Sequence, residues 1–322
     1  MKFATIGHLM VKRDIEKMPE EWIHEKLIIS PELSIKAIKG YIIGFKFTAK
    51  QIIGMPQDKI RQDILDAALF IQDELGVNLI QLGALITSVT SGGKWLVDQG
   101  KYSGFVNHGD SYTSAVACQA VLKSLKLANK NPSDVTIAII GAYGIIGEAV
   151  SKILVPQFNH SILIGRRENK LDELKEKIEG NFETTTYMIT KNADIIVTAT
   201  SHPTALLNSE NLKKNAIVVD VSQPPNLSYN VCQKRKDVLR VDGGFVNLPE
   251  QYPFQIPAVP KGKIFSCVAE ALMQAMENEK QNHVGSIDIK HLRKTEEWAE
   301  KYSFTLNELT NYGNKLETKH TR

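Results

Sequence analysis

Hydrophobic residues along the chain follow two alternating patterns, short continuous runs and longer segments with helical spacing. Between Asp58 and Leu75 the apolar residues fall three or four positions apart, which predicts an amphipathic helix that Gly76 ends. Short runs rich in Val and Ile are typical of strands buried in a parallel sheet. In the second half of the chain such runs occupy Val135–Ile140, Ser161–Gly165, Ala193–Thr198, Ala216–Ser222 and Val238–Val241. The pattern therefore predicts an α/β fold.

The segment 1–128 is predicted to form an α/β domain of its own. Phe3–His8 and Val77–Leu85 read as strands, and Thr87–Gly93 reads as a small polar loop that either binds a ligand or only turns the chain. A long helix begins at Asp110 or Ser111, which are both good N-cap residues, and runs to about Ala128. The polar stretch that follows contains Pro132 and marks a domain boundary.

Two residues at the start of this long helix are candidates for substrate contact. His108 and Tyr112 could position a substrate carbonyl group. The alternative is a capping turn with an ordinary polar surface, and this alternative is favoured.

A glycine-rich loop follows the run that ends at Ile140. The loop has glycines at every third position, and helical sequence begins at Glu148. A glycine turn between a strand and a helix lets backbone N–H groups approach a pyrophosphate at the positive end of the helix. The expected cofactor-binding residues are Gly141, Ala142, Tyr143, Gly144, Ile145, Ile146 and Gly147. The alternative is a tight strand–helix turn that binds no ligand.

The next strand ends where dinucleotide-binding folds select their cofactor. NAD-binding proteins usually carry Asp or Glu there, whereas this chain has Arg166 and Arg167. Two guanidinium groups suit a 2′-phosphate and predict NADPH, unless they form only a solvated basic turn. Thr200 lies in the polar turn after the strand ending at Thr198, a position beside the nicotinamide in such folds. The prediction is a Rossmann domain over 129–262.

Composition narrows the class of protein further. The 322 residues are 43% hydrophobic and carry a net charge of +3, which is too small to argue for nucleic-acid binding. No apolar stretch is long enough to span a bilayer, and the N-terminus lacks the features of a signal peptide. Cys118, Cys232 and Cys267 are far apart and odd in number, so we expect no disulfide framework, no metal site and a cytoplasmic location.

Cys267 is the candidate nucleophile. It lies just after Ser266, at the start of a predicted helix that runs to about Glu279. A helix N-terminus lowers the pKa of a thiol, which predicts a reactive cysteine. A small buried apolar residue is an equally good interpretation of the position alone. The tail from 281 onward is polar, with helical sequence around 291–302.

Several segments resemble one enzyme family in the same order, nearly from end to end. They are MKFATIGHL, the stretch from Gly109 to Cys118, GAYGIIG, and the stretch from Ile264 to Ala271. All are similar to long-chain acyl-[acyl-carrier-protein] reductases of the cyanobacterial type. The chain departs from that family in the glycine loop, where Tyr143 replaces Thr and Ile145 replaces Asp.

The resemblance implies an N-terminal α/β substrate domain (1–128), a Rossmann NADP-binding domain (129–262) and a short helical C-terminal part (263–322) that carries the catalytic Cys267. It implies NADPH-dependent reduction of a long-chain acyl thioester, attached to acyl carrier protein or CoA, to a fatty aldehyde through an acyl-enzyme on Cys267. An aldehyde-consuming partner enzyme could follow. Lysine-rich stretches at 213–214 and 234–236 could dock an acidic carrier.

Two other functions remain open at this point. A shikimate-dehydrogenase-like reductase would transfer hydride directly to a small polar metabolite and would need a lysine–aspartate pair, for which Lys94 and Asp110 are only loosely placed. A non-catalytic NADP-binding sensor would need no thiol at a helix start. Acyl chain length, carrier, pathway, proton donor and oligomeric state are not determined by the sequence.

Overall fold

A computed structural model describes residues 1–252, 254–257 and 259–316. The chain forms two compact units, and each takes its residues from two separate parts of the sequence. Unit 1 comprises 1–112 and 246–305, and unit 2 comprises 113–245 together with the residues from 306 onward. The domains expected from the sequence are consecutive segments, whereas these units interleave. The expectation for 317–322 lies outside the described residues.

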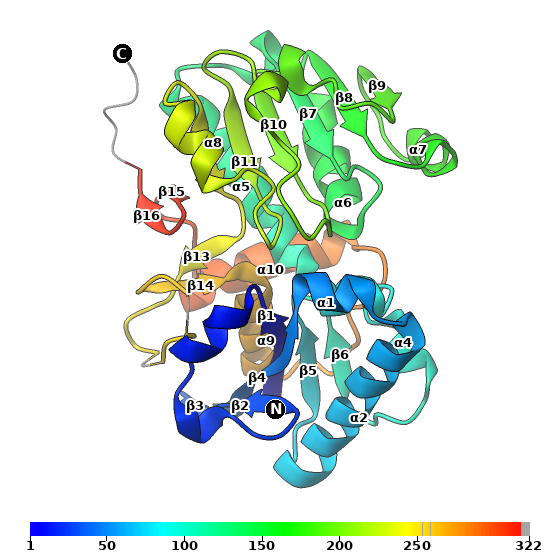
Figure 1. The fold of residues 1–322 in the computed structure, drawn as a ribbon, viewed down its shortest axis with the longest axis vertical. Coiled ribbons are helices and arrows are strands. Elements are labelled where there is room, and N and C mark those ends of the chain that lie inside the picture. The colour runs from blue at the N-terminus through cyan, green and yellow to red at the C-terminus, as the bar shows by residue number, and fades with distance from the viewer. Residues whose placement is uncertain (253, 258, 317–322) are drawn as a thin grey trace. The chain divides into compact units, whose positions relative to one another are not determined.

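Unit 2 contains a parallel sheet of six strands in the order β12-β11-β10-β7-β8-β9 (Figure 1). The strands are β7 (Thr136–Ile140), β8 (His160–Ile164), β9 (Phe182–Thr185), β10 (Ile195–Thr198), β11 (Ile217–Asp220) and β12 (Leu239–Asp242). Strand order reverses at β7, with β8 on one side and β10 on the other, and this is the order of a Rossmann sheet. The expected fold class and five of the six strands are confirmed.

Helices follow three of these strands, and the one after the glycine loop is predicted by the sequence. The helices of this unit are α5 (Asp110–Leu127, which begins in unit 1), α6 (Ile145–Leu154), α7 (Glu168–Lys175) and α8 (Tyr229–Lys234). Between β7 and β12, α6, α7 and α8 follow β7, β8 and β11, respectively. A small antiparallel hairpin, β15 (Thr310–Asn311) with β16 (Asn314–Lys315), completes the described part.

Unit 1 contains a second sheet with a parallel centre. β1 (Lys2–Leu9) pairs in parallel with β4 (Ile38–Thr48) and β5 (Leu79–Leu82), and β5 pairs in parallel with β6 (Phe105–Asn107). The two short strands β2 (Leu27–Ile29) and β3 (Leu33–Ile35) run antiparallel to β4. The N-terminal α/β fold is thus confirmed.

Helices and one short strand pair complete unit 1. α1 (Ala49–Gly54) and α2 (Gln57–Leu75) follow β4, and α2 buries Ile60, Ile64 and Ile71 in the hydrophobic core, as its spacing predicts. α9 (Ser266–Glu277) lies against β1 and β5, and α10 (Ile289–Tyr302) packs on α9. α9 is preceded by β14 (Lys263–Phe265), which pairs with β13 (Phe245–Asn247). None of the described helices is long and apolar enough to cross a membrane.

The structure corrects the expectation of a polar loop at 87–93, because part of this segment is helical. The chain forms α3 (Leu85–Val89) and a turn before α4 (Lys94–Asp98), and β5 ends earlier than expected. Two threonine hydroxyls of this segment donate to backbone carbonyl groups. Thr87 donates to Leu82 O at 2.6 Å, and Thr90 donates to Ile86 O at 2.8 Å.

Candidate functional site

The glycine loop leads from β7 into α6 with very little space around it. Gly141 has φ +86°, and a Cβ there would collide with the carbonyl oxygen of Ala199. A Cβ on Gly147 would collide with the carbonyl oxygen of Gly141, so the helix start and the loop are packed backbone to backbone. Gly144 is the N-cap of α6 and has no side-chain cap. The first-turn N–H groups of α6 are therefore not capped by a side chain, which suits an anionic group.

The two arginines lie where the sequence places them, directly after β8. Both are exposed, and the Arg167 guanidinium lies 5.3 Å from the centre of the Tyr143 ring. The Arg166 N–H donates to the Tyr143 hydroxyl at 3.1 Å. Burial opposes ionisation of Tyr143, but hydrogen bonds with Arg167 and Arg166 outweigh it and lower the pKa of that hydroxyl. Tyr143, which replaces a threonine of the resembling family, thus holds the arginine turn against the glycine loop.

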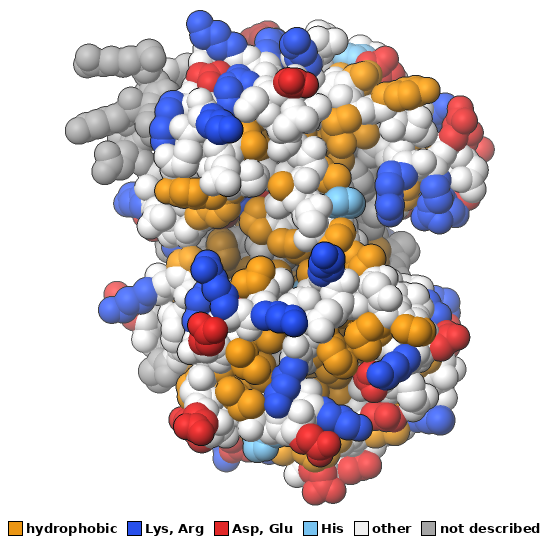
Figure 2. Space-filling view, in the orientation of Figure 1, with side chains coloured by type: hydrophobic (Ala, Val, Ile, Leu, Met, Phe, Trp, Pro, Cys, Tyr) orange, Lys and Arg blue, Asp and Glu red, His pale blue; other side chains and the backbone are white. Residues whose placement is uncertain are grey.

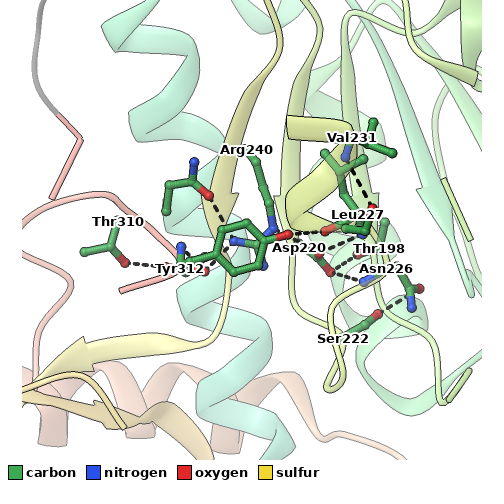
Figure 3. Close-up of polar contacts among 12 residues, drawn as sticks. Thr198, Asp220, Ser222, Asn226, Leu227, Val231, Arg240, Thr310 and Tyr312 are labelled. Atoms are coloured by element: carbon green, nitrogen blue, oxygen red, sulfur yellow. Dashed lines mark hydrogen bonds and ion pairs between the residues drawn. The ribbon is translucent and has the colours of Figure 1, made fainter. Parts of the chain in front are cut away.

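Thr200 lies just after β10 and is held by the turn after β11. Its N–H donates to Ser222 Oγ at 3.0 Å, and its hydroxyl donates to Asn226 Oδ1 at 2.6 Å. The Ser222 hydroxyl donates to the same oxygen at 3.1 Å. Figure 3 shows Ser222 and Asn226 side by side. The Thr200 hydroxyl is thus committed to the protein.

A buried cluster behind this turn fixes the carboxyl end of β11. Asp220 accepts hydrogen bonds from the Thr198 hydroxyl and from two backbone N–H groups, and it pairs with Arg240 at 3.2 Å. Arg240 also pairs with Asp242 at 2.6 Å, and its guanidinium lies 4.0 Å from the centre of the Tyr312 ring (Figure 3). Each buried charge of this cluster thus has an opposite partner, and the Asp220 contacts tie the turn after β11 to the strand ends.

Cys267 lies in the first turn of α9, where the sequence predicts it, and the residue is half-buried. The turn at His108–Asp110 is packed against it. Gly109 has φ +70°, and a Cβ added there would lie 2.5 Å from the Cα, Cβ and carbonyl oxygen of Cys267. A glycine is therefore required beside the thiol. The sequence does not signal this contact, because the two segments are far apart in the chain.

The expected lowering of the thiol pKa is wrong. Burial raises the pKa of the Cys267 thiol to about 12, and the nearby carboxyl groups of Asp110 and Glu270 act in the same direction. Backbone N–H groups at the helix start, including that of Val268, act in the opposite direction but do not compensate. Burial and the Glu270 carboxylate also raise the pKa of Asp110 well above its usual range. Cys267 and Asp110 thus both favour their protonated forms.

Glu270 is fully buried and connects three elements. Its carboxylate accepts a hydrogen bond from the Tyr112 N–H at 2.7 Å, so it satisfies the N-terminus of α5, a helix 158 residues away in sequence. The other oxygen contacts His291 Nε2 of α10 at 3.2 Å. Burial opposes ionisation of Glu270, but His291, His108 and the Tyr112 N–H outweigh it and lower the pKa of the carboxyl group. Glu270 therefore satisfies the N-terminus of a helix other than its own.

The structure gives different roles to the two other candidate residues of this region, Tyr112 and His108. The Tyr112 hydroxyl donates to the carbonyl oxygen of Phe304 and is committed to structure. His108 Nδ1 accepts a hydrogen bond from the Asp110 N–H at 2.9 Å, so the neutral ring carries its proton on Nε2. Burial lowers the pKa of His108 to about 4, and the ring is therefore neutral at pH 7. His108 is a buried N–H donor beside the Cys267 turn.

The lysine-rich stretches are partly used within unit 2. Arg235 pairs with Asp237 and donates to the carbonyl groups of Ser209, Leu212 and Lys213. Lys213 pairs with Asp194 at 2.7 Å. On the face drawn in Figure 2, Lys and Arg side chains are interspersed with acidic and apolar ones. Arg235 is thus a structural residue of the turn before β12.

Comparisons with known proteins match the two units differently. The family model of shikimate/quinate 5-dehydrogenase matches residues 124–243, which cover the Rossmann sheet. The aminotransferase PigE of a Serratia strain is 23% identical over 255 residues, which cover 76% of this chain and 30% of that protein. The long-chain acyl-[acyl-carrier-protein] reductase of Synechococcus elongatus is 25% identical over 205 residues, 57% of this chain and 60% of that one. The chain thus spans less than two thirds of either relative.

Among solved structures, the alignment with L-tryptophan dehydrogenase from Nostoc punctiforme covers 94% of this chain and 80% of that protein's chain. The identity is 14% and the TM-score is 0.43. The sheet order, the glycine loop and the matched family model agree on the cofactor domain. They identify it as the nucleotide-binding domain of an NAD(P)-dependent oxidoreductase of the Rossmann type.

Proposed function

We propose that the protein reduces an acyl thioester to an aldehyde with NADPH, through an acyl-enzyme on Cys267. The observation that supports this most is the placement of Cys267. Cys267 is a half-buried residue at a helix start, packed against a glycine turn, with an aspartate of raised pKa beside it. A covalent step of this kind divides one difficult displacement into two easier ones.

NADPH fits the glycine loop and the arginine turn of unit 2. The uncapped start of α6 would hold the pyrophosphate, and Arg166 and Arg167 would hold the 2′-phosphate. When bound, the cofactor supplies a hydride to the carbonyl carbon. The preference for NADPH over NADH rests on these two arginines.

The chain's own residues would then act in sequence. Cys267 Sγ attacks the thioester carbonyl carbon, and Asp110 takes the thiol proton in the molecules in which it is ionised. Its raised pKa makes that ionised fraction smaller but makes the carboxylate a stronger base than usual. The carrier leaves with its sulfur and a proton from Asp110. Backbone N–H groups at the start of α9 would stabilise the oxyanion. After hydride addition the adduct releases the aldehyde, and Cys267 regains a proton.

The test is a trapping experiment on the full chain. The protein is mixed with a radiolabelled long-chain acyl thioester without NADPH, digested, and its peptides are analysed for label. We expect label on the Cys267 peptide, released as aldehyde when NADPH is added. Cys267→Ser should abolish labelling and turnover while NADPH binding persists, and Cys232→Ser serves as a matched control. No label on Cys267 from either acyl carrier protein or CoA thioesters contradicts the proposal.

A second candidate is direct hydride transfer to a small polar metabolite. It is favoured by the match of residues 124–243 to shikimate/quinate 5-dehydrogenase and by the high pKa of the Cys267 thiol. This reaction would be insensitive to alkylation of Cys267, whereas the covalent reaction would not.

A further inference from the structure

A group of three potential metal ligands lies in unit 1, apart from the residues assigned to the reaction. The residues are Glu279, His283 and His291. Each offers one ligand atom, and the three atoms lie within 4.8 Å of one another. His283 Nε2 is 3.0 Å from Glu279 Oε2. Two ligands of a tetrahedral Zn²⁺ are about 3.3 Å apart, given zinc–ligand bonds of roughly 2.0–2.1 Å. This histidine–carboxylate pair is thus already spaced as two ligands of one ion.

The backbone holds two of these residues firmly. The His283 N–H donates to Val106 O at 2.8 Å, and its carbonyl accepts from the His108 N–H at 3.1 Å, which fixes the segment along β6. His291 lies in the first turn of α10, whose N-cap Asp288 accepts a hydrogen bond from Lys290. Ligands carried on fixed backbone segments lose little freedom when they bind a metal.

His291 also has the outer partner typical of a ligating histidine. The buried Glu270 carboxylate contacts its Nε2 at 3.2 Å. Metal-binding histidines usually donate their other ring N–H to a carboxylate, which fixes the tautomer and leaves the second nitrogen for the ion. Nδ1 of His291 is then the nitrogen available for coordination.

A pocket gives an ion access and room. It has a volume of about 350 Å³, and all of its lining residues belong to unit 1. The three ligand residues line it together with buried His108 and Ser111 and with exposed Lys290 and Lys294. The pocket therefore extends from solvent to the ligand group, and water molecules can complete the coordination.

We propose that Glu279, His283 and His291 bind a Zn²⁺ ion in this pocket, with Glu270 as the outer partner of His291. Two imidazoles and one carboxylate with an open fourth position are a ligand set that zinc takes in proteins. This proposal does not depend on the proposed reaction. Coordination requires one ring to turn, because His283 and His291 are stacked with 3.4 Å between ring centres and 7° between planes, and a metal lies near the plane of each ligating ring.

Lys294 provides a distinctive test, because its ammonium group pairs with Glu279 Oε1 at 2.5 Å. This positive charge repels a cation at the same carboxylate. Lys294 is exposed on α10, and Lys294→Gln should therefore fold normally and bind Zn²⁺ more tightly. A purely structural ion-pair cluster predicts no such gain.

The experiment titrates the purified full chain with Zn²⁺ against a chromophoric chelator and repeats it with Co²⁺, whose visible spectrum reports coordination geometry. We expect one ion per chain, affinity lowered more than about tenfold in His283→Ala and His291→Ala, and higher affinity in Lys294→Gln. His160→Ala, which removes a surface histidine 3.5 Å from Glu183, should leave affinity unchanged.

Three outcomes would overturn the proposal. The first is no binding by the wild-type protein. The second is binding that Cys267→Ser removes and His283→Ala leaves, which places the ion on a thiolate. The third is equal affinity of Lys294→Gln and the wild type. Circular dichroism of each variant verifies folding, and the Lys294 variant decides the question should a histidine variant fail to fold.

Discussion

The Asp110→Asn substitution tests the electrostatics of the Cys267 thiol. The Asp110 carboxyl is the second largest cause, after burial, of the raised thiol pKa. Removing its charge should lower the pKa of Cys267 and speed alkylation. The effect has a pH dependence of known sign. Because the pKa of Asp110 is itself raised, the carboxyl group is neutral at low pH, and Asn then differs little from Asp. The acceleration should therefore grow as pH rises and Asp110 ionises.

The magnitude follows from the thiol pKa. A rise from the ordinary value of 9.0 to about 12 lowers the thiolate fraction at pH 8 by about a thousandfold. A thiolate of higher pKa is also more nucleophilic, with a Brønsted coefficient of roughly 0.4–0.5. Over three pKa units this raises the rate constant of the thiolate about 15- to 30-fold and offsets part of the loss. Cys267 should thus react roughly 30- to 70-fold more slowly than an ordinary exposed cysteine. By the same relation, each pKa unit removed by Asp110→Asn speeds the reaction about threefold.

The assay measures iodoacetamide modification of the Cys267 peptide by mass spectrometry between pH 6 and 9. Asp98→Asn is the matched control, because Asp98 is an exposed aspartate of unit 1 paired with Lys94. An unchanged or slower alkylation rate in Asp110→Asn across this range would refute the electrostatic reasoning. Turnover gives a second readout. If Asp110 takes the thiol proton, the variant should lose turnover while its thiol reacts faster, whereas a purely repulsive Asp110 would leave both rates higher.

Three further predictions follow from single contacts. Gly109→Ala should lower the melting temperature more than Gly76→Ala. Both glycines have positive φ, so an alanine at either position costs about 1–2 kcal/mol of backbone strain. Only the Cβ at position 109 would also clash, against Cys267. Arg167→Ala should weaken NADPH binding about tenfold in a fluorescence titration and leave NADH binding unchanged. His108 has a pKa lowered from 6.5 to about 4, so acidification through this range protonates the unfolded chain first and destabilises the fold. His108→Gln should therefore remove about 3 kcal/mol of the acid-induced loss of stability, measured by urea unfolding at pH 7 and pH 4.

The fold was predictable wherever burial imposes a continuous pattern on the sequence. The strands β7, β8, β10, β11 and β12 are short apolar runs, because they are covered on both faces of the sheet. β9 was missed, since its sequence Phe-Glu-Thr-Thr lies at the edge of the sheet and is only partly buried. The pairing of separate chain segments within one unit could not be predicted, because apolar periodicity reports which face of an element is buried and not which element buries it.

The candidate site was predictable only in its local parts. A glycine loop and a helix-start cysteine are short sequence signals, and the structure places both where expected. The neighbours of Cys267 are not local. Gly109 contacts it, and Glu270 reaches Tyr112 across 158 residues, through packing that no spacing encodes. The hydrogen bond from the His283 N–H to the Val106 carbonyl of β6 is likewise a contact between segments far apart in the sequence.

The pKa of Cys267 shows why a local signal can give the wrong sign. A helix N-terminus contributes a partial positive charge, and its effect falls off within the first turn. At Cys267 this contribution competes with burial and with the Asp110 and Glu270 carboxyl groups, which together raise the thiol pKa to about 12. Such a thiol keeps its proton until a base removes it. The proposed covalent reaction therefore depends on ionised Asp110 acting during the attack, and not on a stored thiolate, so replacing either Cys267 or Asp110 should abolish turnover.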